Sequence, residues 1–324
     1  MQKVKADAKA AVQQGKVKTK RGRYYLTDVK SNWQLYVMVL LPVIWIIMFR
    51  YCPMYGIQIA FKNYMPVKGI TGSEWVGLKH FTRFVKSSQF LMITKNTLAI
   101  SLYQIVLTVT LPIILAIGLN YVKNERFKKS VQMVSYLPHF ISVVILVSMI
   151  NLIFNTQSGI VNNIIFAMTG QKVNILGLSK YFRHLFVWSE VWQSNGWNSI
   201  LYIAALAGVD PQLHEAAKID GANKWRRIYH IDLASIMPTI AIMTIMSMGS
   251  ILTVSFDKMF LMQNTTNLKI SEVFSTYEYK TGVGGGVANY SYSSAIGLMA
   301  SSVTFVLIIF TNKVSKKLSD TGLW

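Results

Sequence analysis

The chain has 324 residues, of which 52% are hydrophobic and only 14% are charged, and its mean hydropathy is +0.37. This composition excludes an ordinary soluble domain and predicts a protein embedded in a lipid bilayer. The formal net charge of +20 would suggest nucleic-acid binding in a soluble chain. The basic run at the N-terminus lacks interleaved aromatic residues, so we expect it to face anionic lipid and no nucleic acid.

Residues 1–30 form a separate basic segment with nine lysines and arginines. Few apolar residues are available there to build a core, so we expect a cytoplasmic tail that is disordered up to about Arg23. Cys52 is the only cysteine of the chain. This count excludes an internal disulfide, and one thiol is no basis for a metal site or redox chemistry.

Six apolar stretches approach the roughly 20 residues that a helix needs to cross the hydrocarbon of a bilayer. They cover residues 34–51, 97–121, 131–154, 185–206, 236–256 and 294–311. The fourth is the least apolar, because polar residues interrupt it. Together the stretches predict an all-α polytopic membrane protein, with a transmembrane domain over residues 31–313 and a short tail over residues 314–324.

Lysine and arginine are concentrated in four segments of this plan. These are the first tail, the loop after the second stretch, the loop over residues 207–233 and the last tail. Because basic residues favour the cytoplasmic side of a membrane, both termini are predicted to lie in the cytoplasm. The same rule places residues 52–93 outside as a long outer loop.

The predicted outer loop carries two short motifs, Pro-Met-Tyr-Gly at residues 53–56 and Trp-Val-Gly-Leu at residues 75–78. Aromatic side chains also gather in this loop as an interface belt would require. The belt alone predicts nothing about a substrate.

The fourth stretch places polar side chains at membrane depth. Glu190, Gln193 and Trp197 recur at i, i+3 and i+7 and so share one face of a helix, with Asn195 in the same stretch. An acidic side chain at the centre of a spanning helix costs roughly 2.5–3.5 kcal/mol on insertion scales. These residues are therefore expected to face a water-filled path or a partner helix, and a pair between Glu190 and Lys258 is the alternative.

The fifth stretch carries small hydroxyl side chains and ends in charges. Ser247, Ser250 and Asp257 lie along one face, and Ser255 and Lys258 cluster at the outer end. A polar face suits a transport path. Serines also permit close helix packing, and an interfacial pair between Asp257 and Lys258 is a further alternative.

The loop over residues 207–233 has a local structure that the sequence predicts in detail. Asp210-Pro211 favours a helix start, with a capping oxygen followed by a proline at the first helical position. Ala216 and Ala217 let another protein approach the backbone, and Glu215 supplies a charge for docking. Gly221 then permits a turn that other residues resist. A second short basic helix is expected at residues 224–227.

The spacing in this loop carries a family resemblance. Glu-Ala-Ala, three residues, Gly, nine residues, Ile, one residue and Leu run from Glu215 to Leu233. This pattern resembles the EAA loop of ABC importer permeases, through which a separate ATPase drives the membrane subunit. One departure is that the family usually has Pro after that Leu, whereas this chain has Ala234 and keeps its proline at Pro238. The resemblance implies an ATPase-coupling element made of Glu215, Ala216, Ala217, Asp220 and Gly221.

The two outer-loop motifs resemble the subgroup of carbohydrate permeases that import oligo- and polysaccharides, and the resemblance extends over nearly the whole chain from Tyr24. It implies half of a heterodimeric channel in the bacterial cytoplasmic (inner) membrane, with a second homologous permease, an ABC ATPase dimer, an extracytoplasmic solute-binding protein and a saccharide as partners. It implies no cofactor and no catalytic residue in this chain. In this family the helix before the EAA loop and the next spanning helix line the pathway. The candidate pathway residues are Glu190, Gln193, Asn195, Trp197, Ser255, Asp257 and Lys258.

Basic residues outnumber acidic ones in the predicted outer segments. An outer entrance lined by these basic residues suits an acidic saccharide such as alginate, because the positive charge attracts an anion towards it. It equally suits an acidic binding protein, and plant-wall oligosaccharides are a further possibility. No Walker-type phosphate loop occurs in the sequence, so ATP hydrolysis is assigned to another subunit.

Two rival functions belong to other classes. An ion-coupled secondary transporter would show inverted repeats and an intramembrane charge relay, and this sequence shows one strong carboxylate in the fourth stretch and no evident repeat. A non-transporting membrane scaffold would need a docking loop but no polar path.

Overall fold

The computed structural model describes residues 31–284, 286, 288–319 and 322–323. The predicted basic tail, residues 1–30, lies outside this part of the chain. The chain divides after Ile57 into two compact units, which are described separately. In the first unit, α3 (Trp33–Ile46) continues into the π-helical turn η1 (Ile47–Tyr51) and the 3₁₀ segment η2 (Cys52–Phe61), the last residues of which belong to the second unit. This helical run of 29 residues is long and apolar enough to cross a membrane, as the first apolar stretch predicts.

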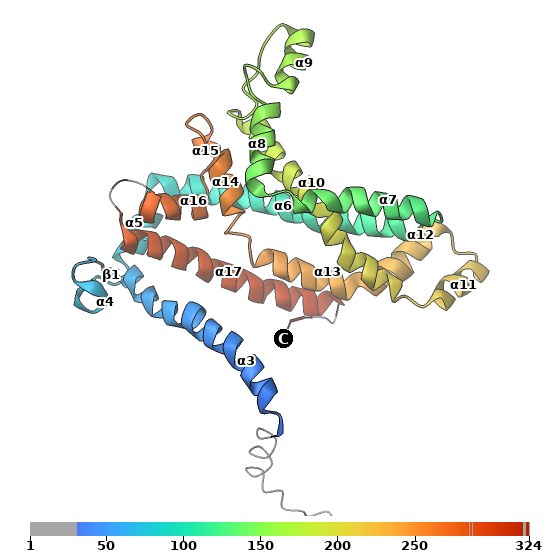
Figure 1. The fold of residues 1–324 in the computed structure, drawn as a ribbon, viewed down its shortest axis with the longest axis horizontal. Coiled ribbons are helices and arrows are strands. Elements are labelled where there is room, and N and C mark those ends of the chain that lie inside the picture. The colour runs from blue at the N-terminus through green and yellow to red at the C-terminus, as the bar shows by residue number, and fades with distance from the viewer. Residues whose placement is uncertain (1–30, 285, 287, 320–321, 324) are drawn as a thin grey trace, which may run out of the picture. The chain divides into compact units, whose positions relative to one another are not determined.

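Four long helices form the body of the second unit. They are α6 (Ser88–Asn120), α10 (Ser179–Ala207), α13 (Leu233–Met248) and α17 (Tyr290–Ser319). Helix α6 packs along α10, and α13 packs along α17 (Figure 1). Helix α17 continues beyond residue 313, where the sequence predicts the tail to begin. These helices hold the functional segments in place at both ends of the unit.

The third apolar stretch forms a bent pair. Helix α7 (Glu125–Tyr136) runs into the 3₁₀ turn η3 (Leu137–Phe140), and α8 (Val143–Ile153) follows at an angle of 96°. The bend follows Pro138, and Ser142 caps the new helix by accepting a hydrogen bond from the Ile145 N–H at 3.3 Å. Helix α9 (Ile160–Thr169) comes next and ends at Gly170, whose φ of 72° is the left-handed conformation that glycine adopts without strain.

The fifth apolar stretch, predicted as one span over residues 236–256, is broken. Helix α13 ends at Met248, residues 249–255 are irregular, and α14 (Phe256–Met262) follows. In the described part of the chain, four helices are long and apolar enough to cross a membrane, or up to five if the bent pair counts as one span. The polar α10 covers the predicted fourth stretch with 29 residues. Length and apolarity alone therefore identify fewer membrane-spanning helices in the described residues than the six that the sequence predicts.

Short elements gather at the two ends of the second unit (Figure 1). At one end lie α11 (Pro211–Ile219), α12 (Lys224–Arg227) and the π-helical turn η4 (Ile228–Asp232). At the other, β1 (Lys62–Asn63) pairs antiparallel with β2 (Glu74–Trp75), with Lys62 opposite Trp75. The remaining elements of that end are α4 (Gly69–Gly72), α5 (Lys79–Val85), α15 (Leu268–Ser271), α16 (Phe274–Tyr279) and η5 (Lys280–Gly284).

Three apolar clusters hold the second unit together. The first joins α6, α8, α10 and α14, with Phe186 and Met259 fully buried in it. The second packs α5, α6 and α16 against α17 around Phe84. The third joins α6, α10 and α13 around Tyr202. Burial of apolar surface therefore accounts for the packing of the long helices, and the polar contacts described next position the sites.

Candidate functional site

The EAA-like loop, residues 207–233, has the local structure that its sequence predicts. The Asp210 carboxylate accepts a hydrogen bond from the Gln212 N–H at 2.9 Å, and Pro211 is the first residue of α11. The helix ends with Gly221 at a φ of 75°, and the Ala222 N–H donates to the Ala217 carbonyl at 2.8 Å. Both the helix start at Asp210 and the glycine turn are confirmed.

Helix α11 presents its surface outward. None of its residues, all of which the structure describes, is buried. Glu215, Ala216 and Asp220 are exposed, and Ala217 is half-buried. The predicted second basic helix is α12, which Asn223 caps by accepting from the Arg226 N–H at 2.9 Å. The loop is therefore two short capped helices, with the residues assigned to coupling within reach of a partner.

A buried carboxylate lies where the EAA-like loop meets the long helices. Asp232 is fully buried, and its Oδ2 accepts a hydrogen bond from the Tyr121 hydroxyl at 2.7 Å. Its Oδ1 makes no hydrogen bond but lies 3.2 Å from Nε2 of His214 in α11, the distance of an ion pair when the imidazole is protonated. The sequence analysis missed this group. An acidic residue immediately before an apolar stretch was the available signal.

Two of the candidate pathway residues form an ion pair. Nζ of Lys258 lies 3.0 Å from Oε2 of Glu190, and it also donates to the Phe186 carbonyl at 3.0 Å. Lys258 is fully buried. The structure therefore brings together α10 and α14 in the pair that the sequence analysis kept as its alternative.

Two further candidates support the bend after α7. Nε2 of Gln193 donates to the Ile141 carbonyl at 2.6 Å, which lies at the break between η3 and α8. The indole of Trp197 stacks on His139 with ring centroids 4.4 Å apart and an interplanar angle of 5°. Gln193 and Trp197 thus hold η3 against α10, whatever other contacts they make.

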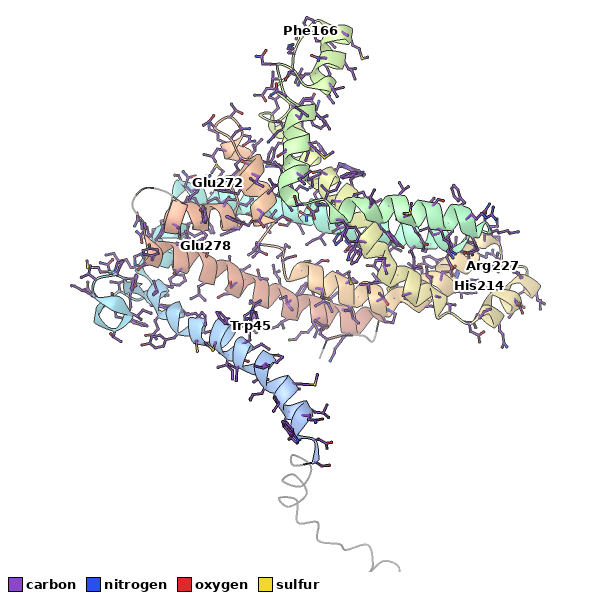
Figure 2. All side chains as sticks on the ribbon, viewed as in Figure 1. Trp45, Phe166, His214, Arg227, Glu272 and Glu278 are labelled. Atoms are coloured by element: carbon purple, nitrogen blue, oxygen red, sulfur yellow. The ribbon has the colours of Figure 1, made fainter. Side chains whose placement is uncertain are left out.

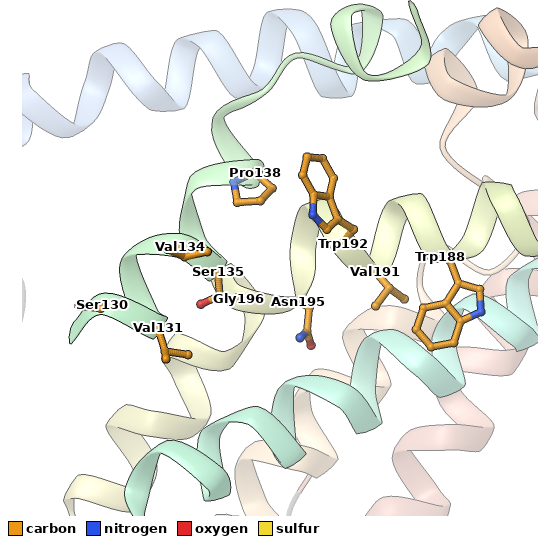
Figure 3. Close-up of a pocket in the computed structure, with 10 residues that line it drawn as sticks. All are labelled: Ser130, Val131, Val134, Ser135, Pro138, Trp188, Val191, Trp192, Asn195 and Gly196. Carbon is orange, nitrogen blue, oxygen red and sulfur yellow. The ribbon is translucent and has the colours of Figure 1, made fainter. Parts of the chain in front are cut away.

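Between α7 and α10 lies a cavity of about 560 Å³, here called the tryptophan cavity (Figure 3). Trp188, Trp192 and Asn195 recur at i, i+4 and i+7, so one face of α10 supplies all three. Oδ1 of Asn195 is buried without a hydrogen-bond partner. The other lining residues are Ser130, Val131, Val134, Ser135, Pro138, Val191 and Gly196.

The sequence analysis included Asn195 but missed Trp188 and Trp192. Their helical spacing was the available signal. They lie on the face of α10 next to the one defined by Glu190, Gln193 and Trp197. Gly196 explains how closely α7 approaches: a Cβ at this position would overlap the Ser135 backbone carbonyl. Glycine is therefore needed where α10 crosses α7.

A second cavity, of about 220 Å³, lies at the break after α13 and is here called the hydroxyl cavity. Ser255 lines it, and the buried Oε1 of Gln104 has no hydrogen-bond partner. Irregular backbone at membrane depth is tolerated where it is buried in protein or lines a water-filled cavity. Asp257, in contrast, is exposed on α14. The remaining lining residues are Ser101, Ile105, Ser250, Ile251, Thr253 and Val254.

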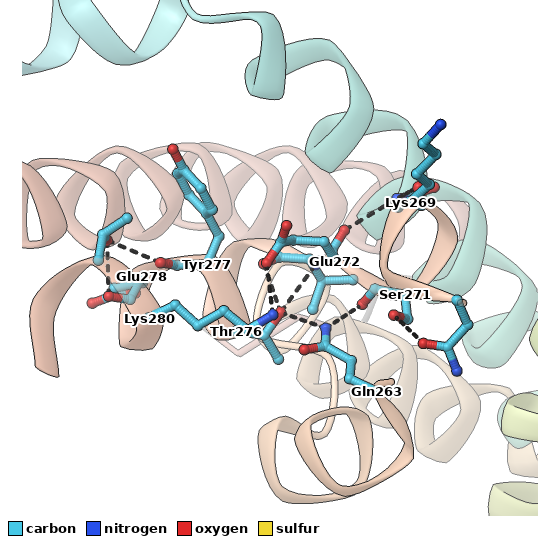
Figure 4. Close-up of polar contacts among 12 residues, drawn as sticks. Gln263, Lys269, Ser271, Glu272, Thr276, Tyr277, Glu278 and Lys280 are labelled. Carbon is cyan, nitrogen blue, oxygen red and sulfur yellow. Dashed lines mark hydrogen bonds and ion pairs between the residues drawn. The ribbon is translucent and has the colours of Figure 1, made fainter. Parts of the chain in front are cut away.

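At the opposite end from α11, a polar network fastens the segment of residues 256–284 (Figure 4). Nε2 of Gln263 donates to the Ser271 carbonyl at 2.8 Å and to the Thr276 hydroxyl at 3.0 Å. Lys280 pairs with Glu272 at 3.0 Å. Glu272 and Glu278 mark this end, and His214 and Arg227 mark the end with α11 (Figure 2).

Comparison with known proteins decides the family. Residues 108–320 match the family of binding-protein-dependent transport system inner membrane components. The chain belongs to this family. The permease is 39% identical over 307 residues to the polygalacturonan/rhamnogalacturonan transport system permease protein YteP of Bacillus subtilis, covering 95% of each chain. It is 36% identical over 304 residues to protein LplB of the same organism, covering 94% of the permease and 95% of LplB.

Among solved structures, the permease is similar to a chain of a bacterial alginate ABC transporter in complex with an alginate pentasaccharide-bound periplasmic protein. The two share 35% sequence identity and a TM-score of 0.83, over 92% of the permease and 99% of that chain. The permease is therefore the membrane component of an ABC importer for sugars or polysaccharides, as its motifs predict.

Proposed function

We propose that this permease carries an acidic oligosaccharide into the cell as one half of a heterodimeric channel in the cytoplasmic membrane. Both termini and the EAA-like loop lie in the cytoplasm, where an ABC ATPase dimer docks on α11. The outer loop and the 256–284 segment receive the sugar from an extracytoplasmic binding protein. The permease itself performs no chemistry, and ATP is hydrolysed by the separate ATPase.

The observation that carries the proposal is the tryptophan cavity. Trp188 and Trp192 are 50% and 49% exposed, so each indole offers a free face. Sugar rings stack on such faces, and Oδ1 of Asn195, which has no hydrogen-bond partner, can accept a hydrogen bond from a hydroxyl. The open side of the cavity is closed by the second permease, so the path runs between the two subunits.

The other candidate residues divide between the path and its walls. Ser255, with the other hydroxyl groups of the hydroxyl cavity, belongs to the path. The Glu190–Lys258 pair, Gln193 and Trp197 hold α8, α10 and α14 in the arrangement that the path requires. Asp257 stays a prediction.

Charge supports an acidic substrate. Among residues 58–95, Glu74 is the single acidic residue against six lysines and arginines. Lys68, Lys79, Lys86 and Lys95 are exposed. Alginate and polygalacturonan both carry carboxylates, and an entrance of opposite charge raises their local concentration. The similarity to proteins for these two polymers points to the same class of substrate.

The substrate proposal is tested with the whole complex in proteoliposomes, by ATP-dependent uptake of labelled oligogalacturonate and oligoalginate beside a neutral arabino-oligosaccharide. Trp188→Ala and Trp192→Ala are each expected to lower uptake of an acidic sugar roughly two- to twelvefold, corresponding to about 0.5–1.5 kcal/mol per aromatic contact. Trp45→Ala, an exposed indole of the first unit, is the control. Wild-type uptake in both cavity variants, or uptake of the neutral sugar alone, would contradict the proposal.

The coupling part is tested separately. Glu215→Lys reverses the charge on the exposed face of α11 and is expected to abolish retention of the ATPase in a pull-down. Glu125→Lys makes the same change at an exposed position of α7 and is the matched control. Full retention of the ATPase and of stimulated ATP turnover in the Glu215 variant would remove the EAA-like loop from the mechanism.

A further inference from the structure

The contact between α11 and the long helices is concentrated in one buried group. Asp232 has no exposed surface, and its two carboxylate oxygens face different elements. Oδ2 accepts from the hydroxyl of Tyr121, the residue that follows α6, at 2.7 Å. Oδ1 lies 3.2 Å from Nε2 of His214 in α11. The end of α6, 111 residues earlier in the chain, therefore meets α11 and η4 at one carboxylate.

Apolar packing contributes little to the position of α11, because none of its residues is buried and its Leu213 and Ile219 side chains are exposed. A buried carboxylate, in contrast, is costly without a charged or hydrogen-bonding neighbour, and His214 is the ion-pair neighbour of the Asp232 oxygen that has no hydrogen bond. The folded protein therefore disfavours any movement of α11 that pulls His214 away from Asp232.

The position of Asp232 in the chain gives this contact a direction. Asp232 is the last residue of the π-helical turn η4, and α13 begins at the next residue, Leu233. Single π-helical turns are frequent at functional sites, where the regular hydrogen-bond ladder is interrupted. A displacement of the carboxylate is thus applied to the first turn of α13 and, through Tyr121, to the end of α6.

We propose that Asp232 is a positioning residue that transmits movement of the EAA-like loop to α6 and α13. The proposal rests on the coupling function proposed above for α11. Asp232 itself touches neither ATP nor sugar. Without its contact, α11 still binds the ATPase, but α11 moves independently of α13.

The test measures the distance between α11 and α13 in the assembled complex. Spin labels are attached at Gln212 and Ser235, both exposed, on a Cys52→Ser background. Distances are recorded by pulsed electron spin resonance without nucleotide and after trapping with ATP and vanadate. In the parent protein the distance is expected to stay the same, because the two helices move together. In Asp232→Asn it is expected to shift and broaden on trapping.

A second readout is ATP turnover stimulated by the sugar-loaded binding protein. Asp232→Asn is expected to lower the stimulation by roughly tenfold, within the 5- to 150-fold range of typical coupling between sites, while the ATPase stays bound. A purely structural role would lower the yield of complex and leave the distance and the stimulation per complex unchanged. Asparagine keeps the shape and an acceptor for Tyr121, so the variant retains part of the contact.

Matched single variants separate the two partners. His214→Gln is compared with His230→Gln, and Tyr121→Phe with Tyr229→Phe, where the control residues are exposed near the same turn. The first member of each pair is expected to reproduce part of the Asp232 effect and the second none. These variants also test the proposal if Asp232→Asn does not assemble.

A distance that stays fixed on trapping in Asp232→Asn and His214→Gln, as in the parent, would overturn the inference. The same is true of a distance that changes equally in parent and variants. Failure of the coupling function is recognised differently. It appears as ATPase retention and stimulated turnover in Glu215→Lys, whereas failure of the Asp232 role leaves the Glu215→Lys defect intact.

Discussion

The EAA-like loop and the 256–284 segment lie at opposite ends of the second unit, and they are held to the long helices in different ways. Helix α11 of the loop buries no residue and meets the bundle through Asp232. The 256–284 segment buries apolar side chains such as Met259 and Phe274 and is also fixed by polar contacts. Local stability in proteins follows such differences in burial and bonding. The comparison indicates a firmly fixed end at residues 256–284 and a movable end at the EAA-like loop.

The largest expected effect comes from removing polar contacts that attach residues 256–284 to α6. Asn96 of α6 is buried and donates to the Lys269 carbonyl at 2.9 Å and to the Glu272 carbonyl at 3.2 Å, and Arg183 donates to its Oδ1 at 3.0 Å. Asn96→Ala leaves these groups without their partner, so we expect a loss of about 3 kcal/mol of stability. Thermal unfolding in detergent measures the effect.

Asn163→Ala, at an exposed position of α9, is the control for that change. An Asn96 variant as stable as this control would show that the 256–284 segment does not depend on its polar contacts with α6. The contrast between the two ends would then rest on apolar burial alone.

A smaller effect is expected at the movable end. Gly221 has a φ of 75° and open space around a new Cβ, so Gly221→Ala costs only the left-handed conformation, about 1–2 kcal/mol. Because α11 is attached through few contacts, the loss is expected to stay local. Hydrogen exchange of residues 211–222 is expected to accelerate while the unfolding temperature of the whole protein stays nearly constant.

Gly118→Ala is the matched control, since its Cβ also meets open space but its backbone is helical. It is expected to be neutral or slightly stabilising. A fall in the unfolding temperature with Gly221→Ala as large as that of Asn96→Ala would contradict the idea of a locally independent loop.

The smallest effect concerns pH at the fixed end. Burial raises the pKa of Glu278 in α16 above its ordinary value. The folded protein therefore binds this proton more tightly than the unfolded chain. The resulting stability is fully present below the ordinary pKa of 4.5 and is lost as the pH rises through the raised value.

Glu278→Gln removes this dependence, so its unfolding temperature is expected to exceed that of the parent at neutral pH, with the difference vanishing below about pH 4.5. Glu74→Gln, at an exposed position of β2, is expected to show no such difference. The same gap between Glu278→Gln and the parent at every pH would indicate a packing effect in place of titration.

Sequence reasoning succeeded where short-range chemistry decides the structure. The start of α11 at Asp210-Pro211, the turn at Gly221 and the helix at residues 224–227 each depend on neighbours within about one helical turn. Long apolar runs such as α6 and α17 were equally visible. The family followed from motifs whose spacing survives in this chain, and the comparisons confirm it.

Sequence reasoning failed where residues distant in the chain complete a local structure. The bend after η3 uses the amide of Gln193, 52 residues further along the chain, and the break after α13 is held by the Ser101 hydroxyl, which donates to the Ile251 carbonyl. Continuous helices were the natural expectation for both apolar stretches. Trp188 and Trp192 were missed because only the approach of α7 makes a cavity of their face.

Composition and local pattern were enough to identify an α-helical membrane permease, with a capped, glycine-ended loop at residues 207–233 and a polar fourth stretch. Composition, caps and motif spacing are properties of neighbouring residues, so one chain is enough to display them. The packed fold was needed to show that Glu190 pairs with Lys258 and that Asp232 lies between His214 and Tyr121. A buried charge must find its partner in space, and packing of the long helices selects which partner lies within reach.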